Sequence, residues 1–140
     1  MIKTGKEYVE SLRKRRIKVY LFGKKVENPV DHPIIRPSIN SVAVTYDVAN
    51  NPNYEDLATA TSHLTGEKIN RFTHMHQSTQ DLVKKVKLLR LLGQKTGICF
   101  QRCVGMDSLN ALSIATFEMD QKLGTSYHKR FTDYLKYVQG

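Results

Sequence analysis

The chain contains two cysteines, Cys99 and Cys103, with three residues between them in the stretch Thr96–Asn110. Thiols at this spacing can converge on one metal ion or cluster, but zinc and iron–sulfur sites need about four ligands. No third cysteine is present, and no histidine lies at a typical ligand spacing from the pair. The histidines are His32, His63, His74, His76 and His128. The pattern leaves three interpretations open: two buried, reduced thiols that act as small hydrophobic side chains, ligands of a metal or cluster, and a disulfide or redox pair.

Two segments with helical apolar periodicity flank the cysteine stretch. The first predicts a helix over 79–92 that is capped by Ser78 and ended by Gly93. Its expected core face is Leu82, Val83, Val86, Leu89 and Leu92. The second predicts a helix from Asp107 or Ser108 to about Lys122, apolar on two faces and therefore buried in a bundle. We expect both cysteines to lie in a loop between these helices.

The remaining segments predict a mainly α fold, a helical bundle with a small N-terminal β-hairpin, as one domain over residues 1–140. A Thr4–Glu7 capping box predicts a helix over 5–15, and a β-branched and aromatic run predicts the hairpin over 18–27. Prolines at 29, 33 and 37 predict an ordered loop, followed by a helix to about residue 49. Its expected face is Ile39, Val42, Ala43 and Tyr46. A weaker helix is expected over 54–64, then a polar irregular segment over 67–77 that could contact a ligand or connect helices in solvent. Thr125 is expected to cap a last helix.

The composition gives a net charge of +9, from 22 lysines and arginines against 13 aspartates and glutamates. A basic surface can bind nucleic acid, phosphorylated ligands or an acidic partner. The positive residues are spread over the chain without a helix-turn-helix, zinc-finger or RNP pattern, so nucleic-acid binding is not favoured and solvated helix faces explain the charge. No apolar run is long enough for a membrane span, and the N-terminus lacks the apolar core of a secretory signal, so the expected location is cytoplasmic.

Several segments of the sequence resemble one family. They are Val19–Gly23, Asn28–Pro33, Arg36–Asn40, Ile69–His74 and the cysteine stretch Gln94–Asp107. These segments are similar to the 4-hydroxybutyryl-CoA dehydratases, which are flavin and iron–sulfur enzymes related to the 4-hydroxyphenylacetate 3-hydroxylases. The pair of cysteines distinguishes the dehydratases from the related monooxygenases.

The resemblance implies the first, helical domain of a longer enzyme with an acyl-CoA dehydrogenase-like fold. In that family a [4Fe–4S] cluster is held by three cysteines and one histidine, and Cys99 and Cys103 match two of the cysteines. The other ligands, the catalytic base and most FAD contacts are then expected in later domains, so this chain alone should be inactive and should not hold either cofactor stably. The implied reaction converts the CoA thioester 4-hydroxybutyryl-CoA to crotonyl-CoA and isomerises vinylacetyl-CoA, in a homotetramer. Gln101 would orient the substrate hydroxyl or the flavin. The alternatives are a component of a flavin-dependent aromatic hydroxylase without a cluster and a basic helical binding module.

Overall fold

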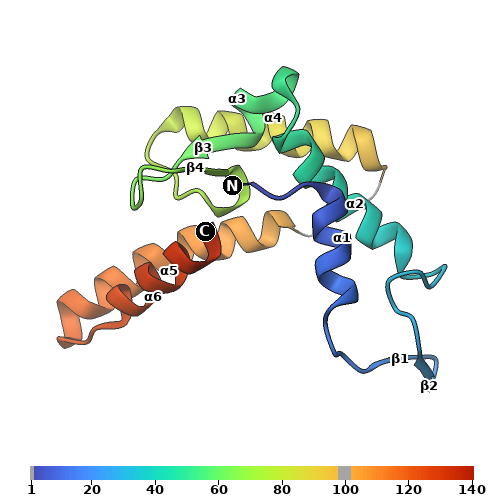
Figure 1. Ribbon diagram of the computed structural model, residues 1–140. Helices are drawn as coiled ribbons and strands as arrows, with labels where there is room; N and C mark the ends of the chain where they lie inside the picture. The colour runs from blue at the N-terminus through green and yellow to red at the C-terminus, as the bar shows by residue number, and fades with distance from the viewer. Residues whose placement is uncertain (1, 98–101) are drawn as a thin grey trace.

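The computed structural model describes residues 2–97 and 102–140 and confirms a mainly α fold with a small N-terminal hairpin (Figure 1). The longer helices are α1 (Gly5–Arg13), α2 (Arg36–Ala49), α4 (Thr79–Thr96), α5 (Arg102–Leu123) and α6 (Tyr127–Gln139). The shorter elements are β1 (Val19–Leu21), β2 (Lys24–Val26), η1 (Pro52–Tyr54), α3 (Glu55–Ala58), β3 (Thr59–Thr61), β4 (Lys68–Asn70) and η2 (Arg71–Thr73). The β1–β2 hairpin and the α5–α6 hairpin extend from the body on opposite sides in Figure 1.

The first helix packs against α2 through an aromatic pair and a tight backbone approach. The Thr4–Glu7 capping box is present as predicted. Tyr8 of α1 stacks on Tyr46 of α2 with ring centroids 4.9 Å apart. The Gly5 amide donates to Asp47 at 2.7 Å, and a side chain at Gly5 would meet that carboxylate at 2.6 Å. The start of the chain is therefore fixed along α2.

The second helix is buried on a different face from the one predicted. Its buried residues are Ser41, Thr45, Val48 and Ala49, whereas the predicted set is only half-buried. Small polar residues can be buried here because Ser41 and Thr45 donate to carbonyls of their own helix, at 3.0 and 2.6 Å. Apolar periodicity alone could not identify a face made in part of hydroxyl side chains.

The predictions for 54–64 and 67–77 are confirmed only in part, as a helical turn and as an irregular stretch after η2. After the single turn of α3, Thr59–Thr61 forms β3 and pairs antiparallel with β4, with Ala60 opposite Ile69. The β-branched threonines favour the strand, and Gly66 adopts a positive φ of 73° in the connection. The second segment is not a solvated connector, because it is largely buried; its buried residues are Ile69, Asn70, Arg71, Phe72, His74 and Met75.

The fourth helix extends one turn beyond its predicted end. Gly93 lies inside it, and Gly97, with φ 66°, is the C-cap. The buried residues are Leu88 and Leu92, whereas the predicted core residues Leu82, Val83 and Val86 are exposed. Leu88 and Leu92 belong to the main core with Val48, Ala49, Ala58, Phe72 and Met106.

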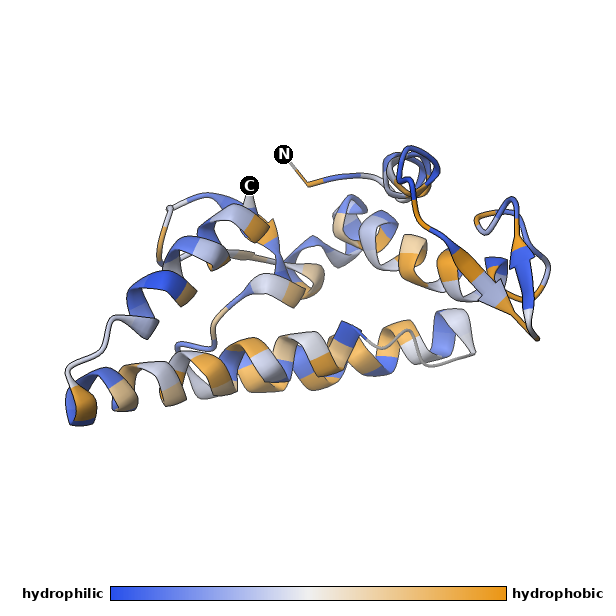
Figure 2. Ribbon diagram, turned by 90° about the horizontal axis from the view of Figure 1, so that it is seen from below, coloured by the Kyte–Doolittle hydropathy of each residue, from blue (hydrophilic) through white to orange (hydrophobic). Residues whose placement is uncertain are grey.

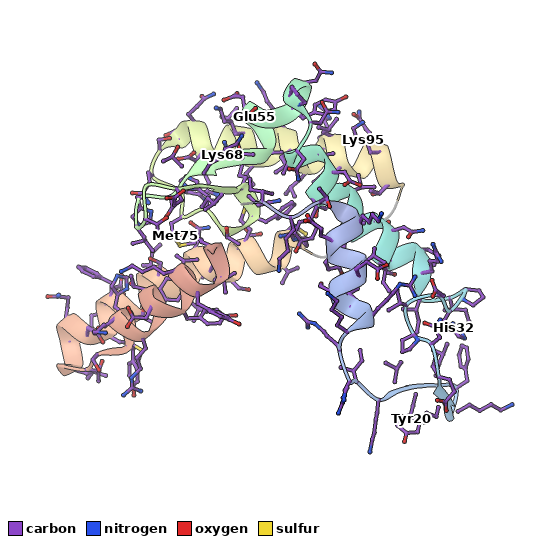
Figure 3. The ribbon with its side chains drawn as sticks, in the orientation of Figure 1. Tyr20, His32, Glu55, Lys68, Met75 and Lys95 are labelled. Atoms are coloured by element: carbon purple, nitrogen blue, oxygen red, sulfur yellow. The ribbon has the colours of Figure 1, made fainter. Side chains whose placement is uncertain are left out.

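The fifth helix also differs from the prediction, since it begins at Arg102 rather than at Asp107 or Ser108. Met106 is its one buried residue in the described structure, and the large apolar side chains further along it are exposed. Figure 2 shows hydrophobic residues recurring along the α4 and α5 helices. The start of α6 is fixed by Asp120 rather than by Thr125, because the Asp120 carboxylate accepts from the Tyr127 and His128 amides. Met75 lies where the α5–α6 hairpin meets the body, packed with Phe131 and Leu135 (Figure 3).

Candidate functional site

The cysteine stretch is divided between a helix and residues outside the described structure. Cys99 and Gln101, both predicted site residues, lie outside the described residues. Cys103 lies in the first turn of α5, not in a loop as predicted, and its thiol is free and half-buried. The described structure therefore locates one of the two predicted cluster ligands, at the positive end of a 22-residue helix.

The residue before Cys103 ties this end of α5 to the body. The Arg102 guanidinium carbon lies 4.6 Å from the ring centroid of Tyr46 and 4.6 Å from that of Phe72, so the cation is sandwiched between two aromatic faces. Its Nη1 donates to Thr45 Oγ1 at 2.5 Å. Burial lowers the pKa of Arg102, and the Tyr46 and Tyr8 hydroxyls act in the opposite direction.

The groups that receive Arg102 are themselves fixed. Asn70 Oδ1 accepts from the Phe72 amide at 3.1 Å, and Asn70 Nδ2 donates to the Thr45 carbonyl at 3.4 Å. Tyr46 is stacked on Tyr8. Helix α2 and η2 thus form one wall against which the start of α5 is held.

A cavity of about 440 Å³ lies beside this wall, and its lining includes residues near both ends of the chain, among them Ile2 and Gly140. Three cations, Lys3, Arg15 and Arg102, line it together with Tyr46 and Asn70. The cavity is thus positively charged and adjoins the residue that precedes Cys103.

A second polar cluster, which the sequence did not predict as a unit, joins α3, β3 and η2 to α4. The buried Arg71 side chain donates to the carbonyls of Leu57, Asp56 and Thr59 at 2.7, 3.1 and 2.6 Å, and to Asp81 Oδ1 at 3.2 Å. Asp81 is also the capping-box partner of Ser78. Burial acts to raise the pKa of Asp81, but hydrogen bonds from Gln77, Ser78 and His74 outweigh it and lower that pKa to about 2. Only the Ser78 cap at the start of α4 was visible in the sequence, because Arg71 is polar by type and gives no sign of burial.

Two histidines of the same region are buried without full hydrogen bonding. His74 Nε2 lies 3.3 Å from Asp81 Oδ1, while the buried atoms His74 Nδ1 and His76 Nε2 have no hydrogen-bond partner among the residues that the structure describes. Burial is the main cause that lowers the pKa of each ring, so both are neutral at pH 7. The residues 2–97 and 102–140 contain no group of three or more histidine, cysteine or acidic side chains that could hold a metal ion. A metal or cluster at Cys103 would need ligands from elsewhere.

Comparison with known proteins identifies the family of the chain. The family described as 4-hydroxyphenylacetate 3-hydroxylase N terminal matches residues 4–140, almost the whole length. The chain belongs to this family. The resemblance found in the sequence is confirmed, and so is the helical architecture that it implied.

Within the family the chain is most similar, among the relatives compared, to dehydratases. It is 63% identical over 139 residues to the 4-hydroxybutyryl-CoA dehydratase/vinylacetyl-CoA-Delta-isomerase of Clostridium aminobutyricum, covering 99% of this chain and 28% of that protein. The solved structure of an oxygen-tolerant archaeal 4-hydroxybutyryl-CoA dehydratase from N. maritimus is 58% identical, with a TM-score of 0.95 over 99% of this chain and 27% of that one. The oxygenase component of 4-hydroxyphenylacetate 3-monooxygenase, HpaB, is 25% identical with a TM-score of 0.74, over 98% of this chain and 28% of that one.

The chain thus spans little more than a quarter of the length of the relatives it matches. In the described part of the chain, none of the helices is both long and apolar enough to cross a membrane.

Proposed function

We propose that this chain is the N-terminal domain of a 4-hydroxybutyryl-CoA dehydratase. The observation that carries the proposal is the 63% identity to the clostridial enzyme over 99% of the chain, with 58% identity and a TM-score of 0.95 to the archaeal one. In the complete protein the enzyme would be a lyase that converts 4-hydroxybutyryl-CoA to crotonyl-CoA, with isomerisation of vinylacetyl-CoA as a second activity. The chain alone would be inactive, because it spans 28% of that relative.

In this proposal Cys99 and Cys103 are two ligands of a [4Fe–4S] cluster. The position of Cys103 fits a ligand, because its thiol is free and half-buried in the first turn of α5. The cluster, when bound, would act as a Lewis acid on the leaving hydroxyl group. This chain's own contribution would be to supply the two thiols, that of Cys103 from the start of α5, while Gln101, which lies between the two cysteines in the sequence, would orient the substrate hydroxyl or the flavin.

The remaining partners lie outside this chain. FAD is supported by relatives of the family, since HpaB structures are described in complex with FAD. A CoA thioester is supported as the substrate by the names of the two dehydratases. We further propose that later domains supply the other cluster ligands and the catalytic base, that the enzyme is a cytoplasmic homotetramer, and that the exposed apolar residues of α5 are covered in it. Those of greatest exposure are Val104, Ile114 and Leu123.

The ligand assignment is tested in the complete enzyme. We expect Cys103→Ala and Cys99→Ala each to lower the iron and acid-labile sulfide content and to abolish dehydration. Ser108→Ala, on the same helix and exposed in this structure, is the matched control and should keep both. If either cysteine variant kept full iron content and dehydration activity, the assignment would be wrong.

A second candidate is a flavin-dependent aromatic hydroxylase. It is favoured by the 37% identity over 59 residues to the 4-hydroxyphenylacetate 3-monooxygenase oxygenase component of Thermus thermophilus. This function requires oxygen-dependent hydroxylation by an iron-free protein, so the iron analysis of the unaltered enzyme discriminates between the two. The basic charge also leaves a nucleic-acid-binding module as a candidate, which would show affinity that falls steeply with salt.

A further inference from the structure

Arg102 is a half-buried cation without an anionic partner in the described structure. Its neighbours there are two aromatic rings and one hydroxyl group, and none of the ion pairs formed by residues 2–97 and 102–140 includes it. Arg71, by contrast, is buried against a carboxylate and three carbonyls. An apolar side chain of similar length could fill the space between the rings, but it could neither interact as a cation with the two aromatic faces nor donate to Thr45. The surroundings of this position therefore match a guanidinium group.

The location of Arg102 indicates what the arginine does. Cys103 is half-buried, and Val104 and Gly105 are exposed. The next fully buried residue is Met106, one helical turn after Arg102. The Arg102 side chain lies between the rings of Tyr46 on α2 and Phe72 on η2, so it joins the first turn of α5 to both elements. The planar guanidinium group stacks on the rings of Tyr46 and Phe72, and one of its N–H groups donates to Thr45. These contacts together fix the rotation of the first turn of α5 about the helix axis.

We propose that Arg102 is a positioning residue that sets where the Cys103 thiol lies, and so allows it to share a cluster with ligands from other parts of the enzyme. The inference rests on the proposed function, since it assumes that Cys103 is a ligand. Arg102 acts through the backbone of α5 and does not itself bind iron. The wall formed by Tyr46, Phe72 and Thr45 is held by Tyr8 and Asn70, so the constraint extends from the cluster site to α1 and β4.

The test uses the complete enzyme with two substitutions, Arg102→Met and Arg102→Lys. Methionine is an unbranched side chain that lacks the charge and the planar guanidinium group, whereas lysine keeps the charge and lacks the guanidinium group. We expect resistance of the cluster to a chelator to fall about 10–100-fold in Arg102→Met, as for other residues that orient metal ligands, and by less in Arg102→Lys. After one-electron reduction to its paramagnetic state, the remaining cluster should give a broadened electron paramagnetic resonance spectrum, because Cys103 then occupies more than one position. FAD content should stay at the level of the unaltered enzyme.

Two controls separate positioning from general stability. Lys95→Met removes another cation that lies 4.8 Å over a ring, that of Tyr54, and should leave the cluster unchanged. Val48→Ala removes buried core volume elsewhere on α2 and should lower the melting temperature while the iron content stays full. If Arg102→Met does not fold, Tyr46→Leu removes one face of the sandwich and should give the same cluster lability.

The outcomes for this inference and for the proposed function are distinguishable. A cluster as resistant to chelator in Arg102→Met as in the unaltered enzyme overturns the positioning role, and so does equal loss of iron in Val48→Ala. If Cys103→Ser keeps a full cluster, the ligand assignment fails as well. If Cys103→Ser loses the cluster and Arg102→Met does not, only the role of Arg102 is refuted.

Discussion

Replacing Arg71 by methionine should remove a large part of the stability of this domain. The side chain is 3% exposed and makes four hydrogen bonds, three of them to main-chain carbonyls. The Thr59 carbonyl is fully buried with its partner, and a buried acceptor left without a donor costs about 1–3 kcal/mol. The Leu57 and Asp56 carbonyls and Asp81 are partly accessible, so water can replace part of each lost bond, at a cost of roughly 0.5–1 kcal/mol apiece.

The sum predicts a loss of about 2.5–6 kcal/mol in the free energy of unfolding, which brackets the range measured when one partner of a buried charged pair is removed. Domains of this size are stable by only about 5–15 kcal/mol, so the variant should be close to unfolding at 37 °C. The measurement is urea denaturation of the 140-residue chain followed by circular dichroism, with a check that the slope of the transition is unchanged. Arg71→Lys keeps a charge for Asp81 but cannot reach all three carbonyls, and we expect it to recover less than half of the loss.

Arg36→Met is the matched control, because Arg36 also pairs with a carboxylate, that of Asp31 at 2.6 Å, but is 52% exposed. It should cost about 0–1 kcal/mol. Equal destabilisation in the two variants, or a loss below about 1 kcal/mol in Arg71→Met, would refute the reasoning that burial of the guanidinium decides its contribution.

Other predictions concern acid sensitivity, histidine protonation and the exposed apolar residues. The pKa of Asp81 is about 2 in the folded chain, against the usual 3.8. The contribution of this carboxylate to stability is therefore present above about pH 4 and is lost as the pH falls toward 2. Over this range the urea midpoint should fall less in Asp81→Asn than in the unaltered chain. The lowered pKa of His74 means that the folded chain disfavours its protonation, so stability is retained above about pH 6.5 and declines below it, and NMR titration of the ring protons should give a pKa under 6.5. Ile114→Lys and Leu112→Lys alter side chains that are 64% and 50% exposed, and should change the free energy of unfolding by no more than about 0.5 kcal/mol while reducing self-association in analytical ultracentrifugation. A larger loss of stability would mean that these residues pack within the domain.

The sequence predicted those elements whose signals are local. The Thr4 and Ser78 capping boxes and the β1–β2 hairpin are present because each depends on a few adjacent residues. Helix α5 ends at Leu123, next to the predicted end at about Lys122, and Gly124 follows it with a φ of 63°. The end of α4 was predicted one turn early, since Gly93 and Gly97 are equally able to end a helix and only the conformation at Gly97 distinguishes them.

The elements that depend on distant partners were not predicted. The β3 strand requires β4 as a partner, and the burial of Arg71 requires the carbonyls of Asp56, Leu57 and Thr59 to converge on it. Apolar periodicity also gave a wrong prediction for α5. A helix that is apolar on two faces is expected to be buried, whereas most large apolar side chains of α5 are exposed in the described chain. Cysteine spacing and resemblance gave Cys103 as a candidate ligand, but no pattern indicated that Arg102 is inserted between two rings.

The same helix that carries Cys103 also carries the exposed apolar surface, and this arrangement bears on how a cluster could be completed. At its first turn α5 is held to α2 and η2 through Arg102, and toward its end it packs against α6, where Phe117 meets His128 edge to face at 5.6 Å. Its position in the domain is therefore set at both ends, while Leu112, Ile114 and further apolar side chains between them are free to bury against another part of the enzyme. A ligand on a helix that is fixed in this way changes position only if the helix moves as a whole. Under the proposed function, burial of the apolar surface of α5 and placement of the Cys103 thiol would be one event rather than two. A domain with a free thiol and no further metal-binding group among its described residues could in this way still contribute to a cluster.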